Sequence, residues 1–410
     1  MRIVLYSYNY HPEPIGIAPL MTELAEGLVK RGHEVRVITA MPWYPASQIA
    51  PEYKGKLYWT EERHGVKIQR CFVWVNQKRG LSNRVLFELS FIFLSLVQAF
   101  NGWRPDLIFL TVPGLPVCLP AAFLGLVYRA PLVLNLQDIL PDAAVHVGLL
   151  TNQKMIKVFQ WLEKFAYGNA NKISVIADGF TKNLLEKDVD SNKITEISNW
   201  VDVNFIHPLP KENNYFRIAN NLVEKFVVLY SGNIALTQPL ETLIDAAALL
   251  QHLPEIQIVI VGKEEALARL DKYRETQGIH NVLLHSFEPR EKLPEMLAAA
   301  DVSMVMQKSN VISFNMPSKI QVLLASGRPI IASVPLTGTA ARAIERSGGG
   351  IVVPPEDPQL IADAILELYG DRARLELLGK QGRRYAQDIY SFEIALDRYE
   401  KLFEEVVQEN

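Results

Sequence analysis

A second series of strands opens at Phe226-Val227-Val228-Leu229-Tyr230-Ser231-Gly232, which lies beyond Pro208-Leu209-Pro210 and the polar stretch 211–221. The two prolines and the polar residues interrupt the pattern of the preceding chain, as a linker between domains does. The run after the linker is apolar without clean alternation, which is typical of a strand buried on both faces of a parallel sheet. We therefore predict two similar domains rather than one very wide sheet.

Strand-like runs occur at regular intervals on both sides of this linker. We predict strands at 2–8, 34–40, 67–75, 106–112, 131–137, 172–177 and 193–198, and then at 226–231, 256–261, 281–286, 302–306, 329–333 and 350–353. Amphipathic patterns, such as 20–31 and 240–253, separate most of them. Apolar strands that alternate with helices predict the α/β class with doubly wound parallel sheets. The expected domains are 1–205 and 206–385, and the last segment, 386–410, is expected to pack back toward the first domain.

The composition is that of a folded protein with a large apolar core. Of 410 residues, 49% are hydrophobic and 21% are charged, which excludes a disordered chain. The net charge of −3 gives no indication of a nucleic-acid partner. Two cysteines, Cys71 and Cys118, are too few for a Cys-based zinc site or a disulfide scaffold. Because the start of the sequence has no secretory signal, we expect a cytoplasmic protein.

A basic stretch, 52–84, precedes an apolar run, 85–100. Its basic residues are Lys54, Lys56, Arg63, Lys67, Arg70, Lys78, Arg79 and Arg84, against three acidic ones. The apolar run is shorter than the roughly 20 residues of a transmembrane helix. Two interpretations remain open: a buried crossover helix, or a basic face of the first domain that contacts anionic lipid at the inner face of the plasma membrane.

Ligands of open α/β sheets bind beyond the carboxyl ends of the strands, so the loops there are the candidate sites. The loop 9–19 contains Gly16 near a helix start, which suits either a phosphate or an ordinary turn. Strand 131–137 ends in Gln137-Asp138, where Asp138 either acts in catalysis or caps a helix. The D-x-D string Asp188-Val189-Asp190 stands before a strand, so we expect a solvated turn there and no metal site.

The most specific string is Asn315-Met316-Pro317-Ser318-Lys319, which opens a helical run that ends at Gly327. Proline near a helix start and glycine just past its end are ordinary boundary residues. Lys319 is unusual, because a cation in the first turn faces the positive end of the helix dipole. A phosphate beside it would make that position favourable, and a surface lysine directed at water is the alternative.

These loops together resemble glycosyltransferase family 4, whose GT-B fold has two Rossmann-like domains and binds a nucleotide-sugar donor. The resemblance covers nearly the whole chain and includes the Gly16 loop, Arg31-Gly32-His33-Glu34-Val35, Asn199-Trp200-Val201-Asp202, Tyr230-Ser231-Gly232-Asn233, 289–301, 317–329 and Val353-Pro354-Pro355-Glu356-Asp357-Pro358. Gln137-Asp138, Asn199-Trp200 and Pro317-Ser318-Lys319 are most similar to the colanic-acid branch of exopolysaccharide fucosyltransferases. There is also some similarity to cyanobacterial heterocyst-envelope polysaccharide members.

The resemblance implies specific site residues. Those implied to bind the donor are Gly16, Ile17, Asn199, Gly232, Asn233, Gln238, Lys263, Phe287, Arg290, Asn315, Met316, Pro317, Ser318 and Lys319. Asp138 would orient the donor sugar or steady positive charge at its anomeric carbon, and Gln137 would hydrogen-bond a sugar hydroxyl or the acceptor. The chain also departs from the family pattern: a histidine becomes Gln137, the donor-phosphate Arg and Lys become Asn233 and Gln238, and two glutamates become Phe314 and Val322.

Neutral amides at the diphosphate weaken donor binding unless Lys319, Lys263 or Arg290 substitutes for the missing cations. The resemblance implies a retaining, metal-independent hexosyltransferase without a cofactor. We expect UDP-glucose as donor, with GDP-fucose next, and a saccharide or lipid-linked saccharide as acceptor. The alternatives are a nucleotide-sugar epimerase of the same fold and a non-catalytic sugar-nucleotide-binding subunit. A dehydrogenase would need a G-x-G-x-x-G fingerprint, which the sequence lacks.

Overall fold

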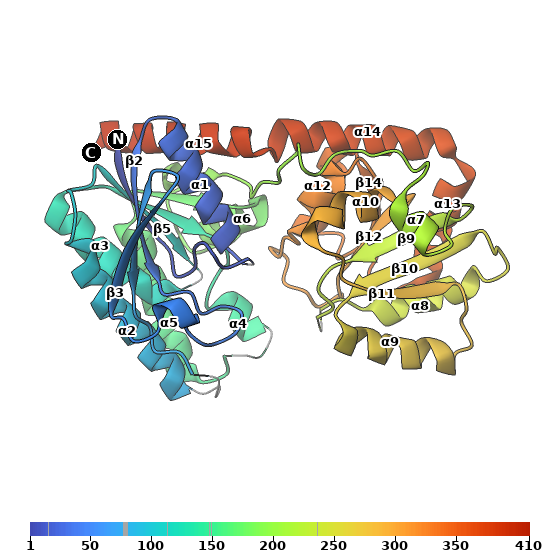
Figure 1. Ribbon diagram of the computed structural model, residues 1–410, viewed down its shortest axis with the longest axis horizontal. Helices are drawn as coiled ribbons and strands as arrows, with labels where there is room; N and C mark the ends of the chain where they lie inside the picture. The colour runs from blue at the N-terminus through green and yellow to red at the C-terminus, as the bar shows by residue number, and fades with distance from the viewer. Residues whose placement is uncertain (15, 77–80, 113, 147, 149, 236) are drawn as a thin grey trace. The chain divides into compact units, whose positions relative to one another are not determined.

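Two sheets, one in each half of the chain, organise the fold (Figure 1). The computed structural model describes the chain except residues 15, 77–80, 113, 147, 149 and 236. One unit comprises 1–198 with 396–410, and the other comprises 199–395. The boundary lies slightly before the expected 205/206, because Val201 forms a bridge with Ser391 and donates its N–H to the Tyr390 carbonyl at 2.8 Å. These contacts hold the residues after 198 in the second unit.

The first sheet has the strand order β3-β4-β2-β1-β5-β6-β7-β8. Its strands are β1 (Arg2–Tyr6), β2 (Glu34–Ala40), β3 (Tyr58–Arg63), β4 (Val66–Cys71), β5 (Leu107–Val112), β6 (Leu132–Leu136), β7 (Lys172–Val175) and β8 (Ile194–Glu196). The α-helices are α1 (Ala18–Lys30), α2 (Leu81–Ala99), α3 (Cys118–Tyr128), α4 (Asp142–His146), α5 (Gln153–Asn169) and α6 (Asp178–Glu186). Neighbouring strands are parallel except β3 and β4, so the predicted α/β class is confirmed.

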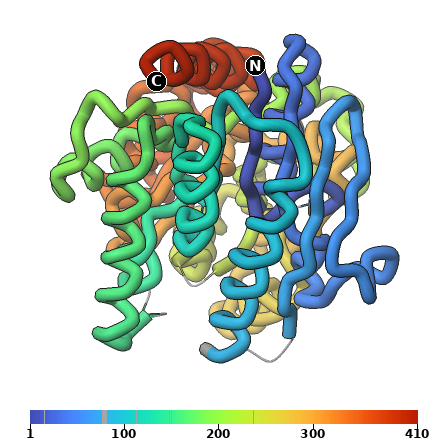
Figure 2. Tube along the Cα trace, turned by 90° about the vertical axis from the view of Figure 1, so that its left-hand side faces the viewer, coloured from blue at the N-terminus to red at the C-terminus, as the bar shows by residue number. Residues whose placement is uncertain are grey.

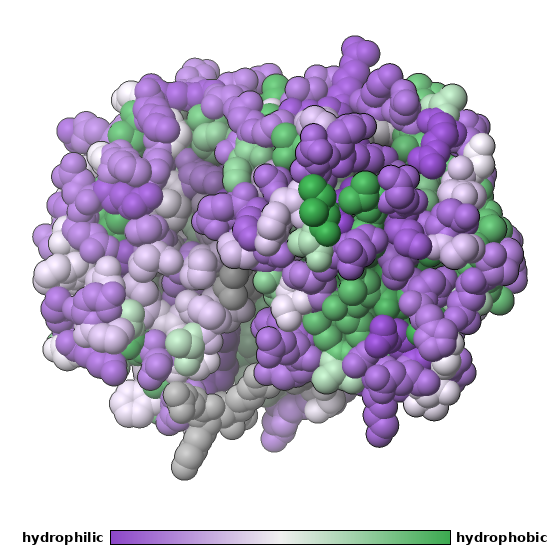
Figure 3. Space-filling model, turned by 45° about the vertical axis from the view of Figure 1, so that its right-hand side comes forward, coloured by the Kyte–Doolittle hydropathy of each residue, from purple (hydrophilic) through white to green (hydrophobic). Residues whose placement is uncertain are grey.

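The second sheet is fully parallel, with the order β11-β10-β9-β12-β13-β14. Its strands are β9 (Phe226–Ser231), β10 (Ile256–Gly262), β11 (Val282–Ser286), β12 (Val302–Met306), β13 (Ile330–Ser333) and β14 (Gly350–Val353). The α-helices of this unit are α7 (Tyr215–Ala219), α8 (Leu240–Leu249), α9 (Glu264–Thr276), α10 (Leu293–Ala298), α11 (Lys319–Ala325), α12 (Thr339–Ser347), α13 (Pro358–Gly370) and α14 (Arg372–Ile389). The last helix, α15 (Phe392–Glu409), begins in this unit, and its residues from 396 on belong to the first unit. Hydrophilic side chains predominate on the surface of this unit that Figure 3 turns forward.

Strand β9 explains why the restart of the sequence pattern marks a second core. Val228 and Tyr230 pack into the apolar cluster on one face of the sheet, and Val227 and Leu229 pack into the cluster on the other. The observed strand has the predicted bounds, 226–231. Both faces of the sheet are covered, so successive residues are all apolar and no alternation is visible in the sequence.

Strand β3 is absent from our sequence prediction. It pairs antiparallel with β4 through a turn at His64-Gly65, both of which have positive φ. Charged and exposed side chains interrupt its apolar pattern, as is common for edge strands that avoid further pairing. The two-residue turn with glycine at its second position was the only available signal for this hairpin.

The last residues of the chain pack on the first sheet. Arg31, at the end of α1, forms ion pairs with Asp397 at 2.6 Å and Glu400 at 2.7 Å. The Tyr399 ring meets Phe109 of β5 edge-on, with ring centroids 5.4 Å apart. These contacts make residues 396–410 part of the first unit.

The basic stretch 52–84 does not form one basic face among the described residues. Arg70 is buried and pairs with Glu61 at 2.6 Å, and Arg63 pairs with Glu26 at 2.7 Å. Lys78 and Arg79, which belong to the predicted stretch, lie outside the described residues. Two members of the stretch are therefore paired with carboxylates within the unit, and contact of this stretch with anionic lipid stays a prediction.

Helix α2 contains the apolar run that follows the basic stretch. Phe87 and Phe91 face the core, but Leu89, Phe93 and Val97 are exposed. The interpretation as a buried crossover helix therefore holds only for its inner face. Figure 2 shows α2 beside α3 and α5 on one face of the first unit. Within the described part of the chain, no helix has the length and hydrophobicity needed to cross a bilayer.

Candidate functional site

The loops that follow the strands of the second sheet meet at its carboxyl edge. Residues 232–235 and 237–239 follow β9, Lys263 follows β10, 287–290 follow β11 and 307–318 follow β12. Because parallel strands end at the same edge, this topology brings most of the predicted donor residues to one side of the second unit. Asn199 also belongs to this unit, at its first position, and is half-buried.

Lys319 is the least ordinary residue at this edge. Its ammonium nitrogen is shielded from solvent and has no hydrogen-bond partner among the described residues. Burial lowers the pKa of Lys319 to about 7. The alternative of a lysine directed at water is therefore wrong. An ammonium that has lost its water and gained no acceptor is costly, so this position calls for an anionic partner.

Tyr230 and Gly232 shape the space around the Lys319 ammonium. The ammonium lies 3.7 Å from the centroid of the Tyr230 ring, a cation–π contact. Gly232 has φ +145°, and a Cβ there would lie 2.8 Å from the Lys319 Nζ. Only glycine leaves room for the ammonium in this position. The Tyr230 hydroxyl donates to the Asn233 carbonyl oxygen at 2.9 Å, so one aromatic side chain supports both the loop and the cation.

Hydrogen bonds tie the loops of this edge to one another. The Lys308 N–H donates to the Thr237 carbonyl at 2.9 Å, which joins the loops after β12 and β9. Gln238 Oε1 accepts from the Ala235 N–H at 2.9 Å, so this predicted donor residue already holds its own loop. Each bond fixes backbone near the predicted donor site, as a preorganised site requires.

Two further bonds come from residues that the sequence did not single out. Gln307 Nε2 donates to Asn315 Oδ1 at 2.7 Å and fixes the start of the 315–319 string. Glu356 Oε2 accepts from the Ser309 N–H at 2.9 Å. Glu356 lies within a string quoted for the family resemblance, but its spacing alone gives no sign that it reaches the loop after β12.

The remaining predicted donor residues of this edge are exposed or half-buried. Lys263 precedes α9, and Arg290 lies with its guanidinium carbon 5.8 Å from the Phe205 ring centroid. Phe287 is 46% exposed. Met316 and Pro317 are half-buried, and Ser318 is exposed at the start of α11. A solvated lysine or arginine provides less electrostatic stabilisation to an anion than a shielded one does.

Asp138 and Gln137 lie at the carboxyl edge of the first sheet, directly after β6. The Asp138 carboxylate accepts from the Ile139 N–H at 2.9 Å. Burial raises the pKa of Asp138 above its ordinary value, against the opposing effect of that hydrogen bond. Gln137 Nε2 donates to the Asn135 Oδ1 at 2.8 Å, inside the buried polar network of β6. A side chain of β6 thus positions Gln137, and the backbone after the strand positions Asp138.

The other predicted sites of the first unit lie near helix ends and turns. Gly16 has φ 72° and is exposed, and Ile17 is the residue before α1; the Ile15 position between them and the strand lies outside the described residues. Asp188 and Asp190 lie in an exposed turn before β8, where Asp190 accepts from the Asn192 N–H at 2.9 Å. The D-x-D string is therefore at the amino-terminal edge, as expected.

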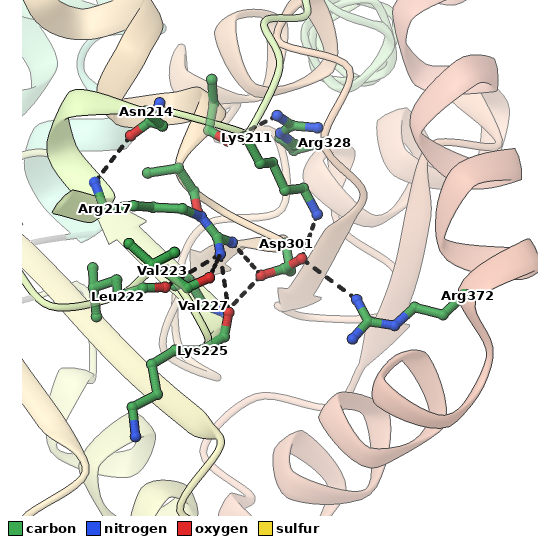
Figure 4. Close-up of polar contacts among 12 residues, drawn as sticks. Lys211, Asn214, Arg217, Leu222, Val223, Lys225, Val227, Asp301, Arg328 and Arg372 are labelled. Carbon is green, nitrogen blue, oxygen red and sulfur yellow. Dashed lines mark hydrogen bonds and ion pairs between the residues drawn. The ribbon is translucent and has the colours of Figure 1, made fainter.

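A pocket of about 500 Å³ lies at the opposite, amino-terminal edge of the second sheet, around Asp301 (Figure 4). Figure 4 shows Lys211, Arg217 and Arg372 converging on the Asp301 carboxylate. Burial alone would raise the pKa of Asp301, but the attraction of Lys211 and Arg217 and its hydrogen bonds hold the pKa below the ordinary value.

This network holds the fold together at the start of β12. Arg217 also donates to the carbonyl oxygens of Leu222 and Lys225, at 3.3 and 3.0 Å. The basic residues that line the pocket are Lys211, Arg217, Lys225 and Arg372, and the acidic ones are Glu212, Glu224, Glu255 and Asp301. Since the two sets balance, the pocket offers no net charge to a phosphate, unlike the surroundings of Lys319.

Comparison with known proteins matches both halves of the chain. Residues 16–200 match the family described as glycosyl transferase 4-like domain, and 211–385 match glycosyl transferases group 1. The protein named colanic acid biosynthesis glycosyl transferase WcaI, from Escherichia coli K12, is 32% identical, covering 89% of this chain and 91% of that protein. WbjE of Pseudomonas aeruginosa, named as a glycosyltransferase, is 25% identical, covering 81% and 83%.

Solved structures of the same fold include two from cyanobacteria. Sucrose-phosphate synthase of Thermosynechococcus elongatus superposes with a TM-score of 0.73 at 17% identity over 100% of both chains. HepE of Anabaena, in complex with UDP and glucose, superposes with a TM-score of 0.71 at 17% identity, over 99% of this chain and 100% of that one. The predicted GT-B fold is thereby confirmed.

Proposed function

Since the chain belongs to glycosyltransferase family 4, whose members retain the configuration of the transferred sugar, we propose that it moves a hexose from a UDP-sugar to a growing exopolysaccharide. UDP-glucose is the first candidate donor, and a lipid-linked saccharide is the candidate acceptor. The name of WcaI supports a role in exopolysaccharide synthesis, and the UDP and glucose bound to HepE support the donor. The shielded ammonium of Lys319 is the observation that carries the proposal.

Lys319 would bind the donor diphosphate in place of the cations that the chain lacks at Asn233 and Gln238. A phosphate oxygen beside the ammonium would supply its missing acceptor, and the charge-assisted bond would be about twice as strong as a neutral one. Gly232 leaves room for the Lys319 ammonium. The hydrogen bond from the Lys308 N–H to the Thr237 carbonyl fixes the two loops on either side of it. Donor binding would thus be preorganised within the second unit.

The chemical step requires groups that stabilise charge on the departing phosphate and at the anomeric carbon. It does not require a pair of catalytic carboxylates. In a front-face retaining transfer, the acceptor hydroxyl attacks from the side that the nucleotide leaves, and the departing phosphate oxygen takes its proton. Lys319 would stabilise the charge that develops on that phosphate. Asp138 would steady positive charge at the anomeric carbon or orient the sugar, and Gln137 would hydrogen-bond a hydroxyl. Neither role requires a metal or a cofactor.

A donor panel tests this function. Purified protein is offered UDP-glucose and GDP-fucose with a lipid extract that carries exopolysaccharide intermediates, and released nucleotide and elongated lipid are measured. We expect UDP release that depends on the acceptor. Release from GDP-fucose alone would favour the fucosyltransferase alternative, and conversion of the donor without acceptor would favour an epimerase. Binding without turnover across the panel would contradict the proposal and favour a non-catalytic subunit.

A further inference from the structure

A fully buried asparagine, Asn135 on β6, is the centre of a polar network in the first unit. Its Oδ1 accepts from Thr111 Oγ1 of β5 at 3.0 Å and from Gln137 Nε2 at 2.8 Å. Its Nδ2 donates to Ser174 Oγ of β7 at 3.0 Å and to the Tyr399 hydroxyl of α15 at 3.1 Å. A side-chain amide can accept two hydrogen bonds and donate two, so these partners use the full capacity of Asn135.

The position of Asn135 in the middle of an apolar strand is unusual. Its neighbours Leu134 and Leu136 are apolar and buried, as is typical of a parallel strand that is covered on both faces. Asparagine is depleted in strands, and a buried amide is costly unless its polar groups are bonded. A leucine or a valine would pack here without that requirement. A fully bonded polar network makes a core rigid and specific, which points to a role in holding a neighbouring group in place.

Tyr399 connects the last helix to this network, although 264 positions of the chain separate it from Asn135. The Tyr399 side chain is fully buried, and its ring meets that of Phe109 on β5 with 5.4 Å between the centroids. The next residue, Glu400, pairs with Arg31 at 2.7 Å and so anchors this part of α15 at the end of α1. The Tyr399 hydroxyl is therefore held in place by packing on the sheet and by an ion pair beside it.

We propose that Tyr399 is a positioning residue for sugar transfer, which acts through Asn135 on Gln137. A glutamine side chain rotates about several bonds, and ordering it when a substrate arrives would cost binding energy. The bond from Gln137 Nε2 to Asn135 Oδ1 fixes this amide before a substrate binds, and the Tyr399 hydroxyl fixes the amide of Asn135 in turn. This role rests on the proposed function, in which Gln137 binds a hydroxyl of the donor sugar or of the acceptor.

Steady-state kinetics of Tyr399→Phe with UDP-glucose and acceptor test the positioning. The variant keeps the ring and removes the hydroxyl, so Asn135 Nδ2 loses one acceptor and keeps Ser174 Oγ. We expect kcat to be about tenfold lower, within the range that a misplaced group costs, and UDP affinity to be unchanged. Tyr6→Phe is the matched control, because the Tyr6 hydroxyl is equally buried in the same unit and donates to Ser95 Oγ at 2.6 Å. The control should transfer sugar at the wild-type rate.

A double-mutant cycle shows whether Tyr399 acts through Gln137. In the Gln137→Ala background the positioned amide is gone, so Tyr399→Phe should lower kcat no further. A general loss of structure would instead lower kcat by the same factor in both backgrounds. Equal factors would overturn the proposal, and so would transfer by Gln137→Ala at the wild-type rate.

Proton exchange at the Gln137 side-chain amide provides a second measurement that needs neither donor nor acceptor. Protein with isotope-labelled glutamine gives this signal by NMR, and Gln137→Ala assigns it. We expect faster exchange in Tyr399→Phe and unchanged exchange in Tyr6→Phe, because only the former loosens Asn135. If wild type transfers no sugar but exchange follows this pattern, the proposed function fails and the positioning stands. If sugar is transferred and Tyr399→Phe changes neither kcat nor exchange, the positioning is wrong and the proposed function stands.

Discussion

The ammonium of Lys319 lies 3.7 Å from the ring centroid of Tyr230, shielded from solvent and without a hydrogen-bond acceptor among the described residues. The aromatic face offsets part of the lost hydration, but it cannot accept the three hydrogen bonds that an ammonium can donate. The free protein thus holds a cation in an unfavourable place. A bound anion would remove the penalty, and this links the stability of the second unit to donor binding.

The first prediction concerns stability without ligand. Lys319→Met should raise the free energy of unfolding at pH 6 by about 1–3 kcal/mol, the usual cost of an unsatisfied buried polar group. Burial lowers the pKa of Lys319 to about 7 in the folded chain, against an ordinary value of 10.5. Below pH 7 both states hold the proton and the penalty is full. Between pH 7 and 10.5 only the unfolded state holds it, so the penalty shrinks as pH rises.

Chemical denaturation of wild type and variant side by side, at pH 6 and pH 9, checks this expectation. The gain should be larger at pH 6. Lys263→Met, which removes an exposed lysine of the same edge, serves as the control and should change stability little. An equal gain at both pH values would show that the Lys319 charge is not what destabilises the free protein.

The second prediction concerns the space beside Lys319. Gly232→Ala places a Cβ 2.8 Å from the ammonium position and strains a backbone with φ +145°. We expect weaker UDP binding in the wild-type background and little further loss in the Lys319→Met background. The double-mutant cycle separates displacement of the ammonium from general damage to the loop. Additive losses would contradict a role for Gly232 in making room for the cation.

The third prediction concerns Asp138. Asp138→Asn should leave UDP affinity nearly intact and lower the rate of transfer by about 10²-fold or more, the scale of one electrostatic contact in a transition state. Asp142→Asn is the control, because Asp142 lies nearby in the chain but pairs with Lys187 at 2.9 Å. If Asp138→Asn transferred the sugar at the wild-type rate, Asp138 would have no role in catalysis and would only accept the Ile139 N–H.

The fourth prediction concerns metal. Transfer should continue in EDTA, and Asp188→Ala should have wild-type activity, because the D-x-D string lies in an exposed turn at the amino-terminal edge of the first sheet. Initial rates with EDTA and with added Mg²⁺ measure this directly. Loss of activity in EDTA, matched by Asp188→Ala, would mean that this turn binds a catalytic ion.

The fold was predictable where the hydrophobic pattern is local. Strands such as β2 and β9 have the predicted bounds, because apolar residues dominate each run and nearly all of their side chains are buried on one face of the sheet or the other. Strand β3 was not predictable in this way, since an edge strand with solvent on one side can carry charge. The exposure of Leu89, Phe93 and Val97 on α2 was not predictable either, because an apolar run in a sequence predicts a buried helix.

The position of the candidate site in the fold was predictable and its contacts less so, and the binding roles of its residues stay predictions. Pro317 predicts the start of a helix and so identifies Lys319 as an unusual cation in the first turn. The contact between Lys319 and the Tyr230 ring is not predictable from the sequence. Gln238 was expected to face the donor, yet its side-chain oxygen holds the Ala235 N–H. Contacts between distant loops depend on the order of the strands in the sheet. The sequence of a single loop does not predict that order.

Calorimetric titration of UDP into the protein at pH 7 tests the central claim most directly. If Lys319 holds the donor diphosphate, Lys319→Met should bind UDP about 30-fold more weakly, equivalent to about 2 kcal/mol for a charged hydrogen bond. The exposed Lys263→Met should stay within about threefold of wild type. Equal UDP affinity of wild type and Lys319→Met would contradict the claim, and a loss confined to Lys263→Met would transfer the role to that residue.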